Sequence, residues 1–287
     1  MDAAILRALE HIRCPFLDVF FGIFTALGEE LIIAAVIAAV YVCIDKRTGE
    51  QALLTVMTAS CLTAGVKSAV RRLRPYAAGV VTRVDIDAPL VSTTDLDADM
   101  SFPSGHATAT GGFFTSLAIR FRRPLSIALC AAFTLLVMLS RLYFGVHYPT
   151  DVLTGLLIGA GCAFLWQLVY SKWYGARLYI YLAAGLLTLP LLFIERTATH
   201  SMFQISAITL ATAAGLLIED RFIRFANAKK WLHRLFRLAL TGAAAAIVYI
   251  PCALWLPEGE WFSFLQYFLT LFTATTLAPF LFKALKI

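Results

Sequence analysis

The chain has 287 residues, of which 60% are hydrophobic and only 15% are charged, and its mean hydropathy is +0.78. Soluble domains are about half apolar and about a quarter charged, so this composition argues against a soluble protein. The apolar residues also fall in blocks that approach or reach the ~17–25 residues needed to cross a hydrocarbon core as helix. We therefore predict an all-α protein that crosses the membrane several times.

The net charge of +6 does not indicate nucleic-acid binding. Lysines and arginines stand at the ends of apolar blocks, where membrane topology places them, rather than in one basic patch. Six cysteines are scattered singly, without the paired spacing of a metal site or a disulfide framework. We read them as small core residues. They are Cys14, Cys43, Cys61, Cys130, Cys162 and Cys252.

The N-terminal segments precede the long apolar blocks. Residues 2–13 carry apolar side chains at helical spacing, which predicts that residues 1–14 contain an amphipathic helix lying on the membrane surface. Residues 16–27 are apolar but short, and Gly28-Glu29-Glu30 interrupts them. A short span, a re-entrant segment and one arm of a bent pair all fit this pattern.

Nine further apolar blocks are long enough to be predicted as spanning helices, and basic residues separate them into two sets of connections. The connections at 45–47, 120–123, 172–177, 221–237 and 283–286 are basic, whereas those at 76–100, 195–200 and 257–260 are acidic or mixed. The positive-inside rule makes the basic set cytoplasmic. The segment 221–237 is itself predicted to be a basic amphipathic helix on the inner leaflet. The nine blocks are 31–44, 52–70, 101–119, 125–139, 152–170, 178–194, 202–218, 238–256 and 261–282.

Charged residues gather at one seam between two apolar blocks, residues 140–151. Charge near lipid is costly, so such residues mark a functional site by default. Arg141 is a permanent cation whose planar fork suits phosphate oxygens. His147 and Asp151 are four residues apart, a spacing at which side chains on one helical turn meet. A carboxylate bonded to one imidazole nitrogen leaves the other nitrogen available as base or nucleophile.

Two further segments on the same predicted side of the membrane carry groups of the same kind. Together the three segments read lysine–six residues–arginine–proline, proline–serine–glycine–histidine, and serine–arginine–five residues–histidine–three residues–aspartate. This ordered pattern resembles the type 2 phosphatidic acid phosphatase superfamily, which includes lipid phosphatases, undecaprenyl-diphosphate phosphatases, glucose-6-phosphatase and the vanadium haloperoxidases. The resemblance fills every motif position and covers roughly residues 15–171. The segments are 67–75, 103–106 and 140–151.

The resemblance implies a fold and a set of roles. Residues 15–172 would form a six-helix-type phosphatase core. The resemblance says nothing about the chain from residue 178 on, where the apolar blocks predict that residues 173–287 form an extension of about four transmembrane helices with an unknown role. His147 would attack phosphorus to give a phosphohistidine, and Asp151 would orient it. His106 would protonate the leaving oxygen and then deprotonate the attacking water.

The chemistry of phosphoryl transfer supports the same residues. Negative charge spreads over the phosphoryl oxygens in transfer, so catalysis depends mostly on positioning and on cations. Lys67, Arg74 and Arg141 supply three cations. Ser104 caps a helix whose N-terminus favours anions, and Gly105 lets the backbone approach phosphate. No carboxylate cluster resembles a two-metal site, so we predict neither a metal nor another cofactor.

Five residues near the motifs keep two interpretations each. Arg71 and Arg72 fit basic side chains snorkelling at a helix end as well as they fit a functional role. Tyr76 is either an interfacial aromatic or part of the substrate entrance. Glu29 and Glu30 either reach the site from the neighbouring helix or have no part in it.

We predict an integral-membrane phosphatase of the bacterial plasma membrane that removes the terminal phosphate of a lipid at the extracytoplasmic face. Undecaprenyl diphosphate is the favoured substrate, and phosphatidic acid or phosphatidylglycerol phosphate comes next. Transfer to an acceptor alcohol is a variant. A non-hydrolytic lipid transporter is the alternative from another class, for which Pro190 and Pro251 are the hints of broken helices. The lipid substrate and the bilayer are the predicted partners, and a homodimer is left open.

Overall fold

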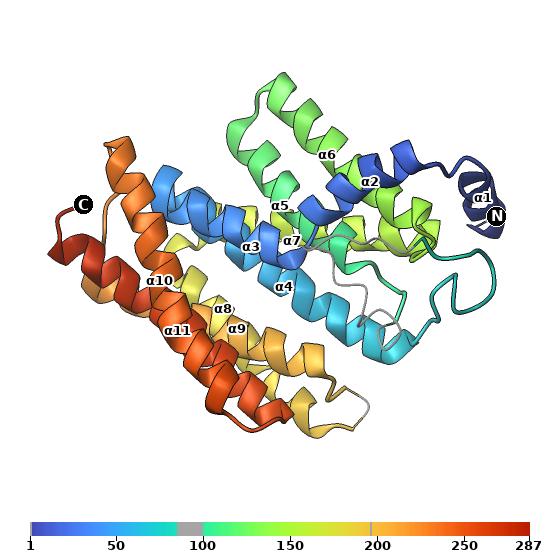
Figure 1. Ribbon diagram of the computed structural model, residues 1–287. Coiled ribbons are helices and arrows are strands. Elements are labelled where there is room, and N and C mark those ends of the chain that lie inside the picture. Colours follow the sequence, from blue (N-terminus) through green and yellow to red (C-terminus); the bar gives the residue numbers. More distant parts are fainter. Residues whose placement is uncertain (1, 85–99, 196) are drawn as a thin grey trace. The chain divides into compact units, whose positions relative to one another are not determined.

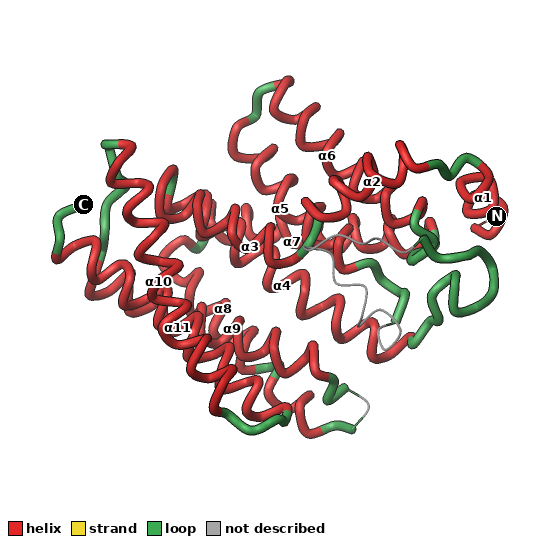
Figure 2. Tube along the Cα trace, in the orientation of Figure 1, coloured by secondary structure: helices red, strands yellow, loops and turns green. Residues whose placement is uncertain are grey.

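A computed structural model describes residues 2–84, 100–195 and 197–287 (Figure 1). Within these ranges the chain is helical without any strand, which confirms the all-α fold class (Figure 2). The predicted loop aspartates at 85, 87, 95, 97 and 99 lie outside the described residues. The α-helices are α1 Asp2–His11, α2 Pro15–Leu27, α3 Glu30–Ala39, α4 Lys46–Val70, α5 Gly105–Phe121, α6 Pro124–Tyr143, α7 Pro149–Lys172, α8 Arg177–Leu186, α9 His200–Ile218, α10 Trp231–Trp255 and α11 Glu260–Ala284.

In the described part of the chain, seven helical segments are long and apolar enough to cross a membrane, or eight if a bent pair counts as one span. The four predicted after residue 173 are among them. Two of the nine predicted spans are not among the seven separate spanning helices. The block 101–119 becomes α5, which has 17 residues, and 31–44 is the second arm of the bent pair.

The bent pair excludes a separate short span for residues 16–27 and leaves a broken span or a re-entrant loop. α2 ends at Leu27, and α3 begins at Glu30 and continues into a π-helical turn, η1 Val40–Ile44. The two arms satisfy the length and hydropathy of a span only together, as a broken span or a re-entrant loop. The short apolar segment is therefore one arm of a bent pair, and the polar residues 28–30 mark its break.

The chain forms two compact units, each with its own helix packing. One unit contains Met1–Val36 and Leu62–Gln167, and the other contains Ile37–Cys61 and Leu168–Ile287. The first, unit 1, has α6 packed against α1, α2 and α5. The second, unit 2, has α9 packed against α8 and α11, and α10 packed against α11 and η1. The domain limits predicted at residues 14 and 172 follow sequence features and stay predictions.

In unit 1 the start of α5 lies directly against the first turns of α7. A Cβ atom added to Gly155 would come within 2.6 Å of the carbonyl oxygen of Ser104, so the close approach requires glycine. The backbone N–H of Ser104 donates to the carbonyl oxygen of Asp151 at 3.1 Å. Two of the three motif segments are thereby held side by side.

The predicted amphipathic helix at 221–237 is wrong as a separate element. A π-helical turn, η4 Glu219–Ile223, ends at Arg224 with a left-handed φ of 54°, and residues 224–230 are not helical before α10 begins. Side-chain hydrogen bonds hold residues 224–230 in place of backbone bonds within a helix. Glu219 Oε1 accepts from the backbone N–H of Phe225 at 3.0 Å, and Asn227 Oδ1 accepts from that of Lys46 at 3.1 Å.

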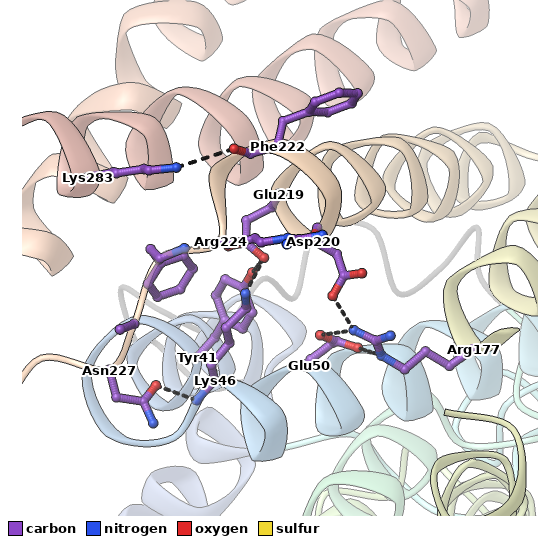
Figure 3. A network of polar contacts seen from close by, with 12 residues as sticks. Tyr41, Lys46, Glu50, Arg177, Glu219, Asp220, Phe222, Arg224, Asn227 and Lys283 are labelled. Atoms are coloured by element: carbon purple, nitrogen blue, oxygen red, sulfur yellow. Dashed lines mark hydrogen bonds and ion pairs between the residues drawn. The ribbon is translucent and has the colours of Figure 1, made fainter. Parts of the chain in front are cut away.

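Unit 2 also contains a buried network of charged side chains (Figure 3). Arg177 at the start of α8 lies between Glu50 of α4 and Asp220 of η4, with its Nη2 at 3.3 Å from Glu50 Oε2 and 2.8 Å from Asp220 Oδ1. Tyr170 donates its hydroxyl to Glu50 Oε1 at 2.6 Å. Glu50 is 2% and Arg177 3% exposed, so both charges are compensated by each other rather than by water.

Candidate active site

The three motif segments meet in unit 1, and the cationic segment after α4 reaches the histidine of the third. Arg74 is buried and lies just beyond the end of α4. Its Nη1 donates to the carbonyl oxygen of Val146 at 3.2 Å and lies 3.3 Å from His147 Nε2. Lys67, in the last turn of α4, contributes its positive charge to the surroundings of His147. The structure therefore brings this first segment to the third.

His147 lies in the turn between α6 and α7 and is 2% exposed. Its Nδ1 lies 2.8 Å from the carbonyl oxygen of Ser101, an oxygen that can only accept, so Nδ1 carries the proton and Nε2 keeps its lone pair. Asp151 Oδ2 is 3.6 Å from Nδ1, too far for a hydrogen bond. Asp151 therefore lies near the His147 ring without bonding it, and the short bond that orients the ring is the one to the Ser101 carbonyl.

Asp151 itself is fully buried and fixed from three directions. Its Oδ2 accepts from the Ser101 hydroxyl and from the backbone N–H of Tyr148 at 2.8 Å. Its Oδ1 accepts from Arg72 Nη1 at 3.0 Å. The Arg72 guanidinium also lies over the Tyr148 ring, 3.7 Å from its centroid. Arg72 therefore has a contact inside the site, whereas Arg71 Nε donates to the carbonyl oxygen of Ser68 at its own helix end.

The second motif segment provides a helix N-terminus and the second histidine. Ser104 is the N-cap of α5 and accepts from the backbone N–H of Ala107 at 3.4 Å, and Gly105 is the first residue of the helix. His106 is partly buried, and its Nε2 lies 3.3 Å from Glu29 Oε1. The charges of Arg74 and Arg141 act on both His106 and His147. One anion-binding region thus has both histidines at its edge.

Arg141 reaches the site from the last turn of α6 and is 4% exposed. Its Nη1 donates to the hydroxyl of Thr25 in α2 at 2.6 Å. Thr25 is itself fully buried, so no water can replace this acceptor. The bond fixes one edge of the Arg141 guanidinium, so the direction in which the guanidinium points depends on the position of α2.

Thr25→Val is expected to weaken phosphate binding several-fold. The exchange keeps the side-chain shape but deprives a buried guanidinium N–H of its acceptor, which costs about 1–3 kcal/mol. The inhibition constant of inorganic phosphate, or KM for the lipid, measures the effect. Thr25→Ser keeps the hydroxyl and should bind phosphate as the wild type does. Equal weakening by both exchanges would contradict this role.

Tyr76 packs beside the site rather than into it. Its ring lies against a buried cluster formed by Tyr143, Phe144 and Val146, and Arg83 lies 5.3 Å from its centroid. These contacts explain its partial burial. Its part in a substrate entrance stays a prediction.

Two groups of the site that lie outside the spans have shifted pKa values. Burial lowers the pKa of His147 well below its ordinary value of 6.5, and the cations Arg74, Arg141 and Lys67 lower it further. Burial raises the pKa of Glu29, but its bond to His106 and the nearby positive charge outweigh burial, so the pKa lies below its ordinary value. In this structure His147 is neutral and Glu29 ionised at neutral pH.

Sequence reasoning missed two residues of the site and left a third, Arg72, open. Ser101 and Thr25 carry common hydroxyl side chains with no distinctive spacing, so nothing in the sequence separated them from other apolar-block residues. Arg72 carried a signal, because it is a basic residue on the side of the membrane where basic residues are disfavoured. Of the two glutamates at 29 and 30, the structure places Glu29 at His106, and the side chain of Glu30 lies outside what is described.

The described residues hold no group of three or more His, Cys, Asp or Glu side chains placed to bind a metal ion. The polar atoms that converge here are instead guanidinium and imidazole groups, a hydroxyl and the N–H groups that open α5. Such donors suit a phosphate, whose oxygens accept hydrogen bonds.

Comparison with known proteins places the site in a family. Residues 50–174 match the PAP2 superfamily, and residues 203–287 match the transmembrane extension of PAP2 superfamily phosphatases. The lipid A 1-phosphatase of Rhizobium etli is 38% identical over 25% of this chain and 30% of its own length. The decaprenylphosphoryl-5-phosphoribose phosphatase of Mycobacterium tuberculosis is 36% identical over 33% of this chain and 46% of its own. The LpxE crystal structure from Aquifex aeolicus is 26% identical, covers 58% of this chain and 94% of that one, and has a TM-score of 0.49.

The matched segments span about a third to a half of these two curated relatives. The two family matches cover separate parts of this chain, the first containing all three motif segments and the second the last helices. All-helical architecture and multiple candidate spans agree with both matches. The chain is an integral membrane protein that belongs to the PAP2 superfamily of lipid phosphatases, with a PAP2 domain followed by a transmembrane extension.

Proposed function

We propose that this protein removes the terminal phosphate of a membrane lipid through a phosphohistidine formed on His147. The observation that carries the proposal is the position of His147 Nε2. It keeps its lone pair because Nδ1 bonds the Ser101 carbonyl, and it lies beside Arg74. A neutral imidazole next to cations that can hold phosphate is arranged for attack on phosphorus.

The reaction has two steps that use the two histidines in turn. The Nε2 lone pair of His147 forms a bond to phosphorus as the bond from phosphorus to the lipid oxygen breaks. That oxygen keeps the electron pair and takes a proton from His106. Water then attacks phosphorus while His106 accepts its proton, and the P–N electron pair returns to His147. Lys67, Arg74 and Arg141 hold the phosphoryl oxygens, with Ser104 and the start of α5.

An isoprenoid diphosphate such as undecaprenyl diphosphate is the proposed substrate. Support comes from relatives whose names specify phosphorylated lipids, one with a polyprenyl chain and one with lipid A. Phosphatidic acid and phosphatidylglycerol phosphate are the next candidates. The proposed location is the extracytoplasmic face of a bacterial plasma membrane, supported by the basic connections at 45–47, 120–123 and 283–286, on the opposite side from the motifs.

Phosphate release from a panel of lipid phosphates and diphosphates tests the proposal. Purified protein is assayed in mixed micelles with EDTA, because the cations of the site make metal-independent chemistry the expectation. Release from at least one lipid, unaffected by EDTA and lost in His147→Ala, is expected. Release that survives His147→Ala would contradict the phosphohistidine. Phosphate appearing on an added alcohol instead of in solution would identify the phosphotransferase variant.

A non-hydrolytic transporter is the second candidate. Pro190 lies in a 3-10 turn, η3 Leu189–Phe193, that follows α8, which is the kind of helix break that transporters use. Pro251, in contrast, lies inside the continuous helix α10. A transporter would keep lipid movement between leaflets of proteoliposomes after His147→Ala, whereas a phosphatase loses phosphate release.

The lowered pKa of His147 predicts the acid side of the pH profile. A histidine whose pKa lies below 6.5 stays neutral, and therefore nucleophilic, until the pH falls through that lowered value. We expect kcat/KM, which reports the free enzyme, to hold to a pH below 6.5, the ordinary pKa of histidine. Lys67→Gln removes one of the cations that lower the pKa of His147, so kcat/KM should begin to fall at a higher pH than in the wild type. A wild-type kcat/KM that falls already at pH 6.5 or above would contradict the assignment of this titration to a histidine with a lowered pKa.

A further inference from the structure

Glu29 contacts the site from outside its three motif segments. It lies at the break between α2 and α3, where its Oε1 is 3.3 Å from His106 Nε2. The preceding Gly28 packs tightly there, because an added Cβ atom would come within 2.6 Å of Val137 Cγ1 and 3.1 Å of His106 Cδ2. The break is therefore fitted against the ring of His106, and it places a carboxylate at one ring nitrogen.

Burial and the positive charges around His106 both oppose its protonated form. Arg141 and Arg74 both act on it as positive neighbours, and His147 is the other titratable group that it faces. A general acid has to carry a proton when the leaving oxygen develops charge. Among the groups that act on His106, Glu29 is the one with negative charge, and a carboxylate at hydrogen-bond distance favours the imidazolium.

We propose that Glu29 is a fourth component of the site, a positioning residue that holds the His106 ring and favours its charged form for proton donation. This inference rests on the proposed function. Glu29 does not touch the lipid. The carboxylate holds the Nε2 proton of His106, so Nδ1 is the nitrogen that gives its proton to the leaving oxygen in the first step. After that transfer the ring is neutral, and Nδ1 can accept a proton from water in the second step.

The kinetic test compares substrates that differ in their need for a proton donor. Glu29→Gln keeps the shape and a hydrogen-bond acceptor but removes the charge. An alkyl phosphate, whose leaving oxygen is strongly basic, should lose about tenfold or more in kcat. p-Nitrophenyl phosphate, whose leaving oxygen needs no proton, should change by less than about twofold. Equal losses on both substrates would indicate a merely structural role and overturn the proposal.

Two further variants isolate the pair. Glu29→Gln combined with His106→Ala should be no slower than His106→Ala alone, because Glu29 acts through that ring. Glu260→Gln is the matched control, since Glu260 at the exposed start of α11 pairs with His200 at 2.8 Å, outside the site. It should leave both substrates unchanged. An additional loss in the His106→Ala background would contradict action through the ring.

A measurement without turnover separates this proposal from the proposed function. Imidazole nitrogen NMR on the full-length protein, labelled at its five histidines, follows the protonation of His106, assigned by loss of its signals in His106→Ala. In Glu29→Gln the ring should lose its proton at a lower pH than in the wild type. An unchanged titration overturns the role of Glu29 whether or not any lipid is hydrolysed, whereas a shifted titration with no phosphate release from wild type would count against the proposed function alone.

Discussion

His147→Ala is expected to lower phosphate release by at least about 10⁴-fold, because it removes the nucleophile and leaves only the binding groups. Rapid acid-free quenching of wild type with ³²P-labelled lipid should trap label on protein, stable to alkali and lost in acid, as an N-linked phosphoryl group requires. The variant should trap none. Label that persists in the variant would place the covalent step elsewhere or remove it.

His200→Ala is the matched control for this experiment. It is the same exchange at an exposed histidine, the first residue of α9 in unit 2, and full turnover is expected. Asp151→Asn should cost less than the loss of His147. The ring is oriented chiefly by the Ser101 carbonyl at 2.8 Å, whereas Asp151 lies 3.6 Å away. A loss as large as that of His147→Ala would show that the charge of Asp151, not ring orientation, is its main contribution.

The site could be predicted as far as its residues carry distinctive chemistry. Arginine and histidine at a membrane seam are rare enough to stand out, so Arg141 and His147 were identified from the sequence alone. The carbonyl of Ser101 was not, because a backbone acceptor has no sequence signature. Glu29 was left open for a related reason: its contact with His106 depends on where the chain bends, and the interruption at 28–30 does not give the direction of the bend.

The fold was predicted best where periodicity and length agree. The last four spans each exceed the length needed to cross a membrane, and their ends were marked by charge. The connector after Ile223 was predicted wrongly because its basic and aromatic residues have helical spacing. Tertiary bonds prevail there: Glu219 accepts from the backbone N–H of Phe225, and Asn227 accepts from that of Lys46 at the start of α4. The spacing of residues along the sequence does not show that tertiary hydrogen bonds compete with a helix at this point.

Arg177→Met is expected to destabilise the protein by about 3–5 kcal/mol, because it leaves the carboxylate of Glu50 buried without its main counter-charge. Glu50 is 2% exposed and, among the described residues, would keep the hydrogen bond from the Tyr170 hydroxyl at 2.6 Å. Asp220, the other partner, has a 47% exposed side chain and can be hydrated instead. Thermal unfolding of the full chain in detergent should show an apparent midpoint lower by roughly 6 °C or more.

The compensating exchange identifies the cause of this loss. Glu50→Leu combined with Arg177→Met removes both charges and should recover most of the midpoint, since a buried ion pair replaced by apolar side chains is often neutral. Arg221→Met is the matched control, because that arginine is exposed and donates to the Tyr179 hydroxyl at 3.3 Å. It should change stability by no more than about 0.5 kcal/mol. A double variant as unstable as Arg177→Met alone would mean that stacking of the Arg177 guanidinium over the Tyr174 ring, rather than pairing with the buried charge of Glu50, stabilises unit 2.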